Sequence, residues 1–362
     1  MPSSTNLNSP SEAVTDVVWI QTAFAGDIVL STGALKLLQE RLPHIRQHVI
    51  TTSIGLEILK GVPFLTSTQA LPKSFSIKSL QGFLNIKKTL KKKIQTPSTT
   101  RILQPHRSSR SSLLRLFLGY QSYTWKTASL SWTAHGTVDP LPHEHETMRV
   151  AKLLSHIGIE PLSEPKISPY LAPLPLQVQI PWQRKIQDHT GIWVAFAPGS
   201  VWGTKQWQMT KYLQLAHLLL EKTPVHILWI GGPQEKKLKA YIPPDHPRMI
   251  DTIGETSFDD LRRFFPRLQL LVSNDSSPVH FASAFNIPTV TIWGATAPSL
   301  GFSSLSTRQK NIEQKLPCRP CHSHGPQVCP KVHFKCMNET AVETVAQACL
   351  ELLSTEDTRH KN

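Results

Sequence analysis

The stretch VVWIQTAFAGDIVLSTGALKLLQER, residues 17–41, decides the fold of the first half of the chain. It opens with a short apolar run from Val17 to Gln21. After Gly26 and Asp27, apolar residues recur at helical spacing to about Arg41. A strand followed by a loop and a helix is one βα unit, and such units build parallel sheets. The stretch therefore predicts an α/β fold.

The same alternation continues along the chain and begins again past its middle. The predicted strands are 49–52 and 101–103, then 192–197, 225–230, 270–273 and 289–293. The predicted helices are 77–94, 111–118 and 143–156, then 210–221, 234–241, 276–285 and 339–353. The second set of strands is almost continuously apolar, which is typical of strands covered by helices on both faces. We therefore predict two doubly wound domains, with the ligand site in the cleft between them.

Proline density marks the predicted boundary between the domains. Six prolines lie between 161 and 181, too many for regular structure. We expect a disordered leader over 1–15, an N-terminal domain over 16–170, a linker over 171–185, a C-terminal domain over 186–338, and a C-terminal helix and tail over 339–362. The leader lacks the basic and apolar order of a secretory signal, and no apolar run is long enough to span a membrane, so we expect a cytoplasmic protein.

The 362 residues carry a net charge of +14, and most of it is concentrated in one region. Between Glu57 and Asp139 there are thirteen Lys and Arg and no Asp or Glu. A long region of one sign favours a polyanionic partner, such as nucleic acid, anionic lipid or a phosphorylated saccharide. For the cluster Lys87 to Lys93 alone, a solvated helix face is an equally good interpretation.

Asp27 follows the first predicted strand, at the sheet edge where open α/β domains bind ligands. Its carboxylate is a candidate for acid or base chemistry in the cleft. The alternative is a structural helix N-cap, which spacing alone favours. The loop has a single glycine and no GxGxxG, so a dinucleotide cofactor is not indicated.

Three loops of the second half offer groups that bind phosphate. Ala197-Pro-Gly-Ser200, followed by Lys205, supplies backbone N–H groups, a hydroxyl and a cation. The segment from Ser273 to His280 is the most polar junction and places groups at a helix N-terminus. Gly231 and Gly232 permit close backbone approach. Each loop alone could be ordinary structure, but their convergence at strand ends favours a binding site.

Four cysteines lie near the end of the second domain. Cys318, Cys321, Cys329 and Cys336 could hold a structural zinc, although the later spacings match no common finger. Reduced thiols without metal are the alternative in the cytoplasm. Cys349, on the last helix, is interpreted as core packing. The absence of a DxD pair means that nothing requires a divalent ion at the phosphates.

Together these motifs resemble the lipopolysaccharide ADP-heptose heptosyltransferases, glycosyltransferase family 9, and most closely the heptosyltransferase II branch. The resemblance rests on WIQTAFAGDIVLST (19–32), APGSVWGTKQW (197–207), VSNDSSPVH (272–280) and the cysteine segment 318–337. It runs in order from about Val17 to Leu353. Gly33 departs from the family, which often has proline there.

The resemblance implies a GT-B fold of two Rossmann-like domains, the first for the acceptor and the second for ADP-heptose. It implies inverting transfer of L-glycero-D-manno-heptose with no cofactor required for catalysis. Asp27 matches the general base and Lys205 the cation that stabilises the departing ADP. The matches to donor-contacting positions are Ser200, Asp275, Ser276, Ser277 and His280, and we add Gly231 and Gly232.

The implied acceptor is the (heptosyl-)Kdo2-lipid A inner core, which is itself a polyanion. We predict that Arg107 and Arg110 contact it, and that Lys87 to Lys93 hold a monomeric enzyme to the inner face of the inner membrane. The alternatives are another nucleotide-sugar donor or core acceptor, a sugar-nucleotide epimerase of similar fold, and a basic nucleic-acid-binding protein. The last lacks any RRM, KH or zinc-finger pattern, so we expect no nucleic-acid partner.

Overall fold

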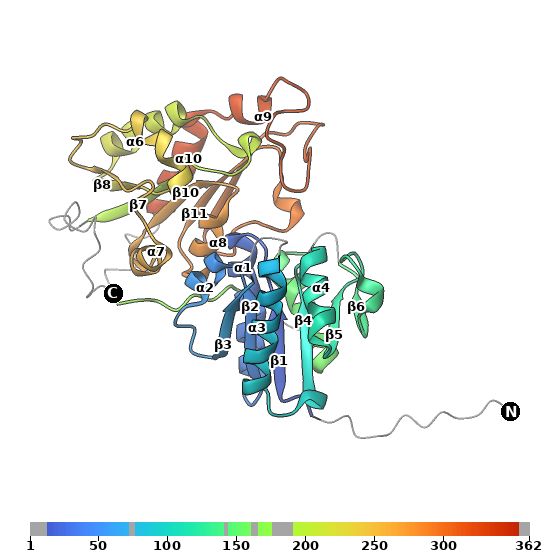
Figure 1. Ribbon diagram of the computed structural model, residues 1–362. Helices are drawn as coiled ribbons and strands as arrows, with labels where there is room; N and C mark the ends of the chain where they lie inside the picture. Colours follow the sequence, from blue (N-terminus) through green and yellow to red (C-terminus); the bar gives the residue numbers. More distant parts are fainter. Residues whose placement is uncertain (1–12, 72–76, 141–143, 161–165, 176–190, 355–362) are drawn as a thin grey trace.

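The computed structural model describes residues 13–71, 77–140, 144–160, 166–175 and 191–354. Most of the predicted leader, the greater part of the predicted linker and the tail after 354 lie outside these residues. The rest forms two α/β domains, each built on a parallel sheet with helices on both faces (Figure 1). The predicted fold class is confirmed.

The N-terminal sheet has the order β3-β2-β1-β4-β5-β6. Its strands are β1 (Asp16–Ile20), β2 (Arg46–Thr51), β3 (Leu65–Ala70), β4 (Thr100–Gln104), β5 (Gln121–Trp125) and β6 (Gly136–Val138). Its helices are α1 (Ala25–Arg41), α2 (Ser53–Leu59), α3 (Ile77–Lys93), α4 (Ser109–Leu118) and α5 (Glu146–Lys152), with short 3-10 turns η1 (Pro97–Thr99), η2 (Ser131–Thr133) and η3 (Leu153–Ile157). The helix predicted over 143–156 is thus α5 plus η3, and its first residue lies outside the described part.

The C-terminal sheet repeats this topology, with the order β12-β11-β10-β7-β8-β9. Its strands are β7 (Ile192–Ala197), β8 (Val225–Trp229), β9 (Met249–Asp251), β10 (Leu270–Asn274), β11 (Thr289–Trp293) and β12 (Gln309–Glu313). Its helices are α6 (Met209–Lys222), α7 (Phe258–Phe264), α8 (Ser277–Ala284), α9 (Lys335–Asn338) and α10 (Val342–Ser354), with 3-10 segments η6 (Gly203–Lys205), η7 (Pro233–Tyr241), η8 (Phe265–Arg267) and η9 (Pro298–Leu300). The helix predicted over 234–241 is therefore a 3-10 segment. None of its side chains is buried, so no packing against the sheet favours an α-helix there.

Sequence reasoning missed the strands β3, β5, β6, β9 and β12. These five lie toward the edges of the two sheets, and polar residues interrupt their apolar runs. In both sheets the strand order reverses beside the first strand, between β1 and β4 and between β7 and β10. Ligands of open α/β sheets bind at the carboxyl ends of strands at this point, so the order locates the candidate site.

Helix α1 joins the two domains. Its residues from Ile28 to Ala34 are all buried, because the helix packs against the N-terminal domain and also against α8 of the C-terminal domain. One continuous apolar cluster includes Leu35 of α1 together with Trp193, Phe264 and Phe281 of the C-terminal domain. On the opposite face of the C-terminal sheet, α10 packs against α6, and Cys349 is fully buried there, as predicted.

Gly33 allows the chain that leaves the N-terminal domain to cross α1. A Cβ atom at Gly33 would lie 2.9 Å from Cγ2 of Ile167 and 3.0 Å from the carbonyl oxygen of Ser168. At the preceding residue, Thr32 Oγ1 accepts a hydrogen bond of 2.8 Å from the backbone N–H of Tyr170. The close packing of Ile167 and Ser168 against α1 therefore explains why a glycine is needed at position 33.

Candidate functional site

The carboxyl ends of β1, β4, β7 and β10 bring the predicted site residues to the boundary between the domains. Asn274, at the end of β10, fixes the two C-terminal loops relative to each other. Its side-chain amide donates to the carbonyl of Pro198 at 2.7 Å and accepts from the backbone N–H of Trp207 at 3.1 Å. The loops that follow β7 and β10 are therefore one rigid unit.

Asp27 lies in the first turn of α1. The N-cap residue is Phe24, so Asp27 is not the N-cap, but its carboxyl does accept hydrogen bonds from the backbone N–H groups of Phe24 and Asp27 at the start of the helix. The pKa of the Asp27 carboxyl is raised to about 7, first because it is buried and then because the Glu146 carboxylate is near, while Lys205 acts in the opposite direction. A carboxyl with a pKa near neutrality can take up and release a proton under ordinary conditions, as a general base must.

Glu146 was not predicted, and it comes from the first turn of α5. Its carboxylate pairs with Arg149 at 3.2 Å and also feels the charge of Arg107. The N-terminus of α5 meets the C-terminal domain, because the Glu146 N–H donates to the carbonyl of Gly301 at 2.8 Å and Nε2 of His145 donates to the carbonyl of Ser303 at 2.9 Å. Glu146 is thus held beside Asp27 by contacts that span both domains.

Lys205 and Asp275 form a largely buried ion pair in the C-terminal domain. The distance from Lys205 Nζ to Asp275 Oδ2 is 2.6 Å, and Oδ2 also accepts a hydrogen bond from Thr296 at 2.6 Å. Asp275 therefore orients the Lys205 ammonium, and it is not the N-cap residue of α8. Ser276 is the N-cap residue, although its side chain makes no capping bond, and Ser277 begins the helix.

Three further donor candidates, Ser200, Gly231 and Gly232, lie in the loops around a carboxylate that sequence reasoning missed, Glu235. A Cβ atom at Gly199 would lie 1.6 Å from Glu235 Oε1, and the Gly232 N–H donates to Oε2 at 2.6 Å. Ser200 lies in the same loop, and its hydroxyl accepts from the N–H of Trp202 at 3.2 Å. Gly231 also approaches Glu235. A carboxylate among backbone N–H groups is suited to accept hydrogen bonds from sugar hydroxyls.

His280 brings α8 directly against the first turn of α1. A Cβ atom at Gly26 would lie only 2.8 Å from Cδ2 of His280. Burial first, and then the charges of His145 and Lys205, lower the pKa of His280 to about 3, so the ring is neutral. Among the described residues, its buried Nδ1 has no hydrogen-bond partner. This nitrogen is free to bond a ligand that reaches it.

Arg107 and Arg110 flank the start of α4, after β4. The Arg107 guanidinium lies over the Trp125 ring, 5.3 Å from its centroid. Its charge acts on Glu146 and on His324, which places it at the domain boundary. Burial lowers the pKa of Arg110. Beside them, His106 Nδ1 lies 2.8 Å from the Thr22 hydroxyl and 3.1 Å from the Ser111 hydroxyl, so polar groups of the β1 and β4 loops meet here.

The cysteine segment packs over the donor loops. Arg319 Nε donates to the carbonyl of Gly294 at 2.6 Å, and the carbonyl of Pro326 accepts from Thr204, the neighbour of Lys205. Cys318 Sγ lies 3.9 Å from His333 Nε2. Within the described ranges, no three His, Cys, Asp or Glu side chains form a group that could hold a metal ion, so a structural zinc is not supported.

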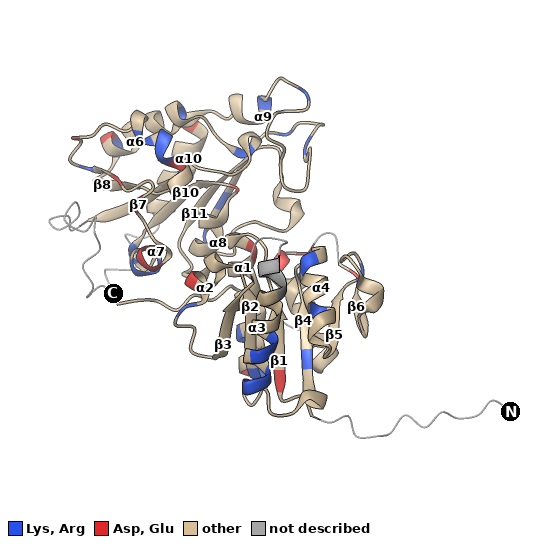
Figure 2. Ribbon diagram, in the orientation of Figure 1, with Lys and Arg blue, Asp and Glu red and all other residues tan. Residues whose placement is uncertain are grey.

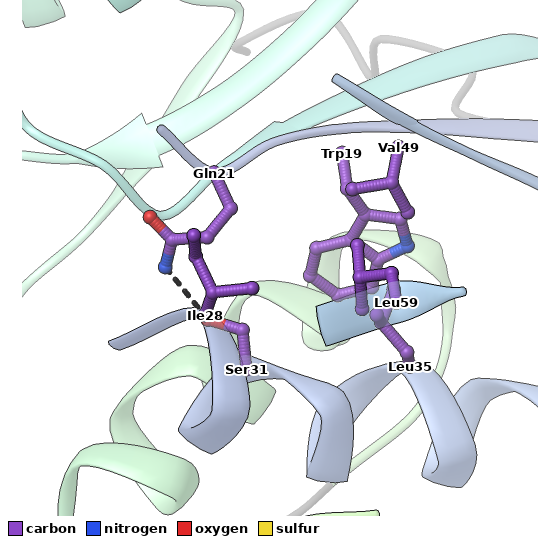
Figure 3. A pocket seen from close by; sticks show the side chains of 7 residues that line it. All are labelled: Trp19, Gln21, Ile28, Ser31, Leu35, Val49 and Leu59. Atoms are coloured by element: carbon purple, nitrogen blue, oxygen red, sulfur yellow. Dashed lines mark hydrogen bonds between the residues drawn. The ribbon is translucent and has the colours of Figure 1, made fainter. Parts of the chain in front are cut away.

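A small pocket lies under α1, one turn from Asp27 (Figure 3). Its lining residues are Trp19, Gln21, Ile28, Ser31, Leu35, Val49 and Leu59. Gln21 Nε2 donates to the Ser31 hydroxyl at 2.6 Å, and Ser31 in turn donates to the carbonyl of Asp27 at 2.8 Å. The pocket is apolar apart from these two side chains, and this hydrogen-bonded chain supports the turn that carries Asp27.

The model of the family "Glycosyltransferase family 9 (heptosyltransferase)" matches residues 88–331, well over half of the chain. The chain belongs to glycosyltransferase family 9. Its similarity to a lipooligosaccharide heptosyltransferase 2 of Campylobacter jejuni is 22% identity over 160 residues, which cover 43% of this chain and 49% of that protein. The match thus spans about half the length of this relative.

Solved structures of family 9 share the fold across nearly the whole chain. A family 9 glycosyltransferase from Veillonella parvula superposes with a TM-score of 0.80 at 16% identity, covering 96% of this chain and all of that one. The ADP-heptose LPS heptosyltransferase II of Escherichia coli gives 0.75 at 18% identity, covering 95% and 100%. In the described part of this family 9 chain, no helix has the length and apolar character that a membrane crossing requires.

Proposed function

We propose that this family 9 enzyme transfers L-glycero-D-manno-heptose from ADP-heptose to the (heptosyl-)Kdo2-lipid A inner core of lipopolysaccharide, with inversion at the anomeric carbon. The observation that carries the proposal is that Asp27, whose carboxyl pKa is about 7, lies across the domain boundary from Lys205, whose charge acts on it. The names of the family and of the relatives support the heptose donor.

The reaction is a single displacement. The Asp27 carboxylate takes the proton of the acceptor hydroxyl as its oxygen bonds to the anomeric carbon, and the bond from that carbon to the ADP oxygen breaks. ADP leaves with an additional negative charge. Lys205, oriented by Asp275, stabilises this charge where it develops. The donor phosphates meet Ser200, Ser276, Ser277 and the N-terminus of α8, where free N–H groups favour anions.

Glu235 extends this proposal to the nucleoside. The oxygens of the Glu235 carboxylate, beside Gly199, Gly231 and Gly232, can only accept hydrogen bonds, so they suit the hydroxyls of a ribose and repel phosphate. We therefore place the ribose of ADP at Glu235 and its phosphates away from it. His280, with its neutral ring and unpartnered Nδ1, lies against Gly26, the neighbour of Asp27, and can bond a donor oxygen there.

The acceptor is proposed to meet Arg107 and Arg110, because guanidinium groups pair well with phosphate and carboxylate. A cytoplasmic enzyme would reach this lipid-linked substrate at the inner face of the inner membrane, held there by Lys87 to Lys93. Release of ADP from ADP-heptose tests the proposal. Purified enzyme receives Kdo2-lipid A or its singly heptosylated form, with Asp27→Asn as the control variant.

Release that requires the heptosylated acceptor and collapses in Asp27→Asn would support the heptosyltransferase II assignment and the base. Release that requires the unheptosylated acceptor would move the enzyme to the first transfer. Consumption of donor without acceptor would favour an epimerase, and turnover of another nucleotide sugar would replace the donor. No acceptor-dependent release with either lipid contradicts the proposal.

A further inference from the structure

Four large apolar side chains are exposed on neighbouring elements of the N-terminal domain, namely α3, α4 and the loop that contains η2. They are Leu84 (53% exposed), Leu113 (41%), Leu116 (43%) and Trp132 (82%), and we name this surface the α3–α4 face. A single exposed apolar residue needs no explanation, but several on adjoining elements indicate an interaction surface.

The three elements are held together by contacts beneath the face. The rings of Phe83 on α3 and Phe117 on α4 lie 5.8 Å apart, and Lys87 Nζ donates to the carbonyl of Phe117 at 2.7 Å. On the other flank, the guanidinium of Arg115 on α4 donates to the carbonyl of Leu130 at 2.8 Å, which fixes the loop that carries Trp132.

Leu113 and Leu116 are three residues apart, so they share one side of α4, opposite the buried Leu114 and Leu118. Helices α3 and α4 lie side by side on one face of the N-terminal sheet (Figure 1). The exposed apolar groups are therefore presented by a rigid surface.

The border of the α3–α4 face is cationic. Figure 2 shows Lys and Arg gathered on α3 and α4. The exposed ones on α3 are Lys88, Lys91, Lys92 and Lys93. No Asp or Glu occurs in the sequence between Glu57 and Asp139 to balance them. Leucine and tryptophan bordered by lysine are typical of segments that lie in a membrane interface. A nucleic-acid backbone would match the lysines but would leave the leucines unburied.

The face is continuous with the proposed acceptor site. Helix α4 begins just after Arg107, whose charge acts on Glu146 beside Asp27, and extends for about 15 Å from there. We propose that the α3–α4 face inserts shallowly into an anionic bilayer, with Leu84, Leu113, Leu116 and Trp132 below the headgroups and the lysines at the lipid phosphates. The inference rests on the proposed function in one respect, namely that the acceptor is lipid-linked.

Vesicle binding tests this insertion without any enzyme activity. The full chain is sedimented with vesicles of phosphatidylcholine alone and with vesicles that contain phosphatidylglycerol. We expect tight binding only to the anionic vesicles, weakened about tenfold in Leu113→Ser/Leu116→Ser. Val328→Ser, at an exposed valine of the C-terminal domain, is the matched control and should bind as the unaltered chain does.

The depth to which the α3–α4 face inserts is measured with lipids that are brominated on their acyl chains. Bromine quenches the fluorescence of nearby tryptophans. Among the tryptophans of the described residues, Trp132 is the one on the face, so Trp132→Phe should abolish most of the quenching. Trp132 is so exposed that its replacement leaves the fold intact. Equal binding by the leucine variant, or quenching that persists in Trp132→Phe, would overturn the proposal.

Other outcomes separate the rival partners. Binding to anionic vesicles that leaves Trp132 unquenched by the brominated lipids would reduce the face to a charge contact and overturn insertion. Self-association that the leucine variant loses, with vesicle binding unchanged, would assign the face to a second copy of the chain. Failure of all heptosyl transfer while vesicle binding follows the prediction would overturn the proposed function alone.

Discussion

The two sheets have the same strand order, yet their carboxyl edges present opposite chemistry. The N-terminal edge offers an Asp27 carboxyl whose pKa is about 7, whereas the C-terminal edge offers the cation of Lys205 bound tightly by Asp275. One group is left ready to change its protonation, and the other is held in an ion pair. A shared topology therefore supplies the positions, and the local environment of each side chain supplies the role.

Removal of the Asp27 carboxylate should have the largest effect. Asp27→Asn keeps the shape and loses the base, so kcat should fall about 10³-fold, as measured by ADP release. Because the folded-state pKa is raised above 3.8 to about 7, ionisation of Asp27 costs stability as pH rises through this window. The variant should therefore melt no lower than the unaltered enzyme at pH 8, and a lower Tm would show that Asp27 supports the fold.

The Lys205–Asp275 pair should behave in the opposite way. Lys205→Met removes the cation from the leaving group, which should lower kcat about 10²-fold. It also leaves Asp275 buried without its partner, which should cost about 3 kcal/mol of unfolding free energy, measured by urea denaturation.

The double variant Lys205→Met/Asp275→Asn serves as the control for the ion pair. It should regain most of the stability and none of the activity. Recovery of activity in the double variant would contradict the role of Lys205.

The contact between the edges can be altered at Gly26. In Gly26→Ala the new methyl would lie 2.8 Å from the His280 ring, so α1 and α8 must move apart. We expect a loss of about 2 kcal/mol in unfolding free energy, because overpacking of a tight contact is destabilising. The same substitution in a His280→Ala background should cost much less. An equal cost in both backgrounds would mean that the ring is not the obstacle.

The smallest expected effect is a shift in pH dependence. Glu146→Gln removes a negative charge near Asp27, so the pKa of Asp27 should fall. The acidic limb of the kcat/KM profile should then move to lower pH by about half a unit or more.

Glu40→Gln removes the same charge from the exposed far end of α1 and should leave the profile in place. A profile unchanged by Glu146→Gln would mean that burial alone raises the pKa of Asp27.

The sequence was enough to predict the central strands and the loops after them, because covered parallel strands are continuously apolar. It was not enough for edge strands such as β12, with the sequence QKNIE, whose polar residues give no such pattern. Three further features could be found from the local sequence alone. They are the absence of acidic residues between Glu57 and Asp139, the loop that carries Lys205 and the turn that carries Asp27.

Glu146 and Glu235 could not be assigned in this way. Glu146 is remote from Asp27 in sequence and meets it only through the packing of α5 against α1. Glu235 gave one weak signal, its position three residues after Gly232 at the start of η7, which is the spacing of a capping box. That spacing predicts a local helix start and says nothing of the contact with Gly199. Long-range contacts decide both roles.

The apolar cluster shared by Leu35, Trp193, Phe264 and Phe281 has a consequence for how this molecule unfolds. Most two-domain chains can melt one half at a time, because little apolar surface joins the halves. Here separation of the domains would uncover core side chains of both, so neither half retains its full stability alone. We therefore expect the two sheets to unfold together, in one cooperative transition.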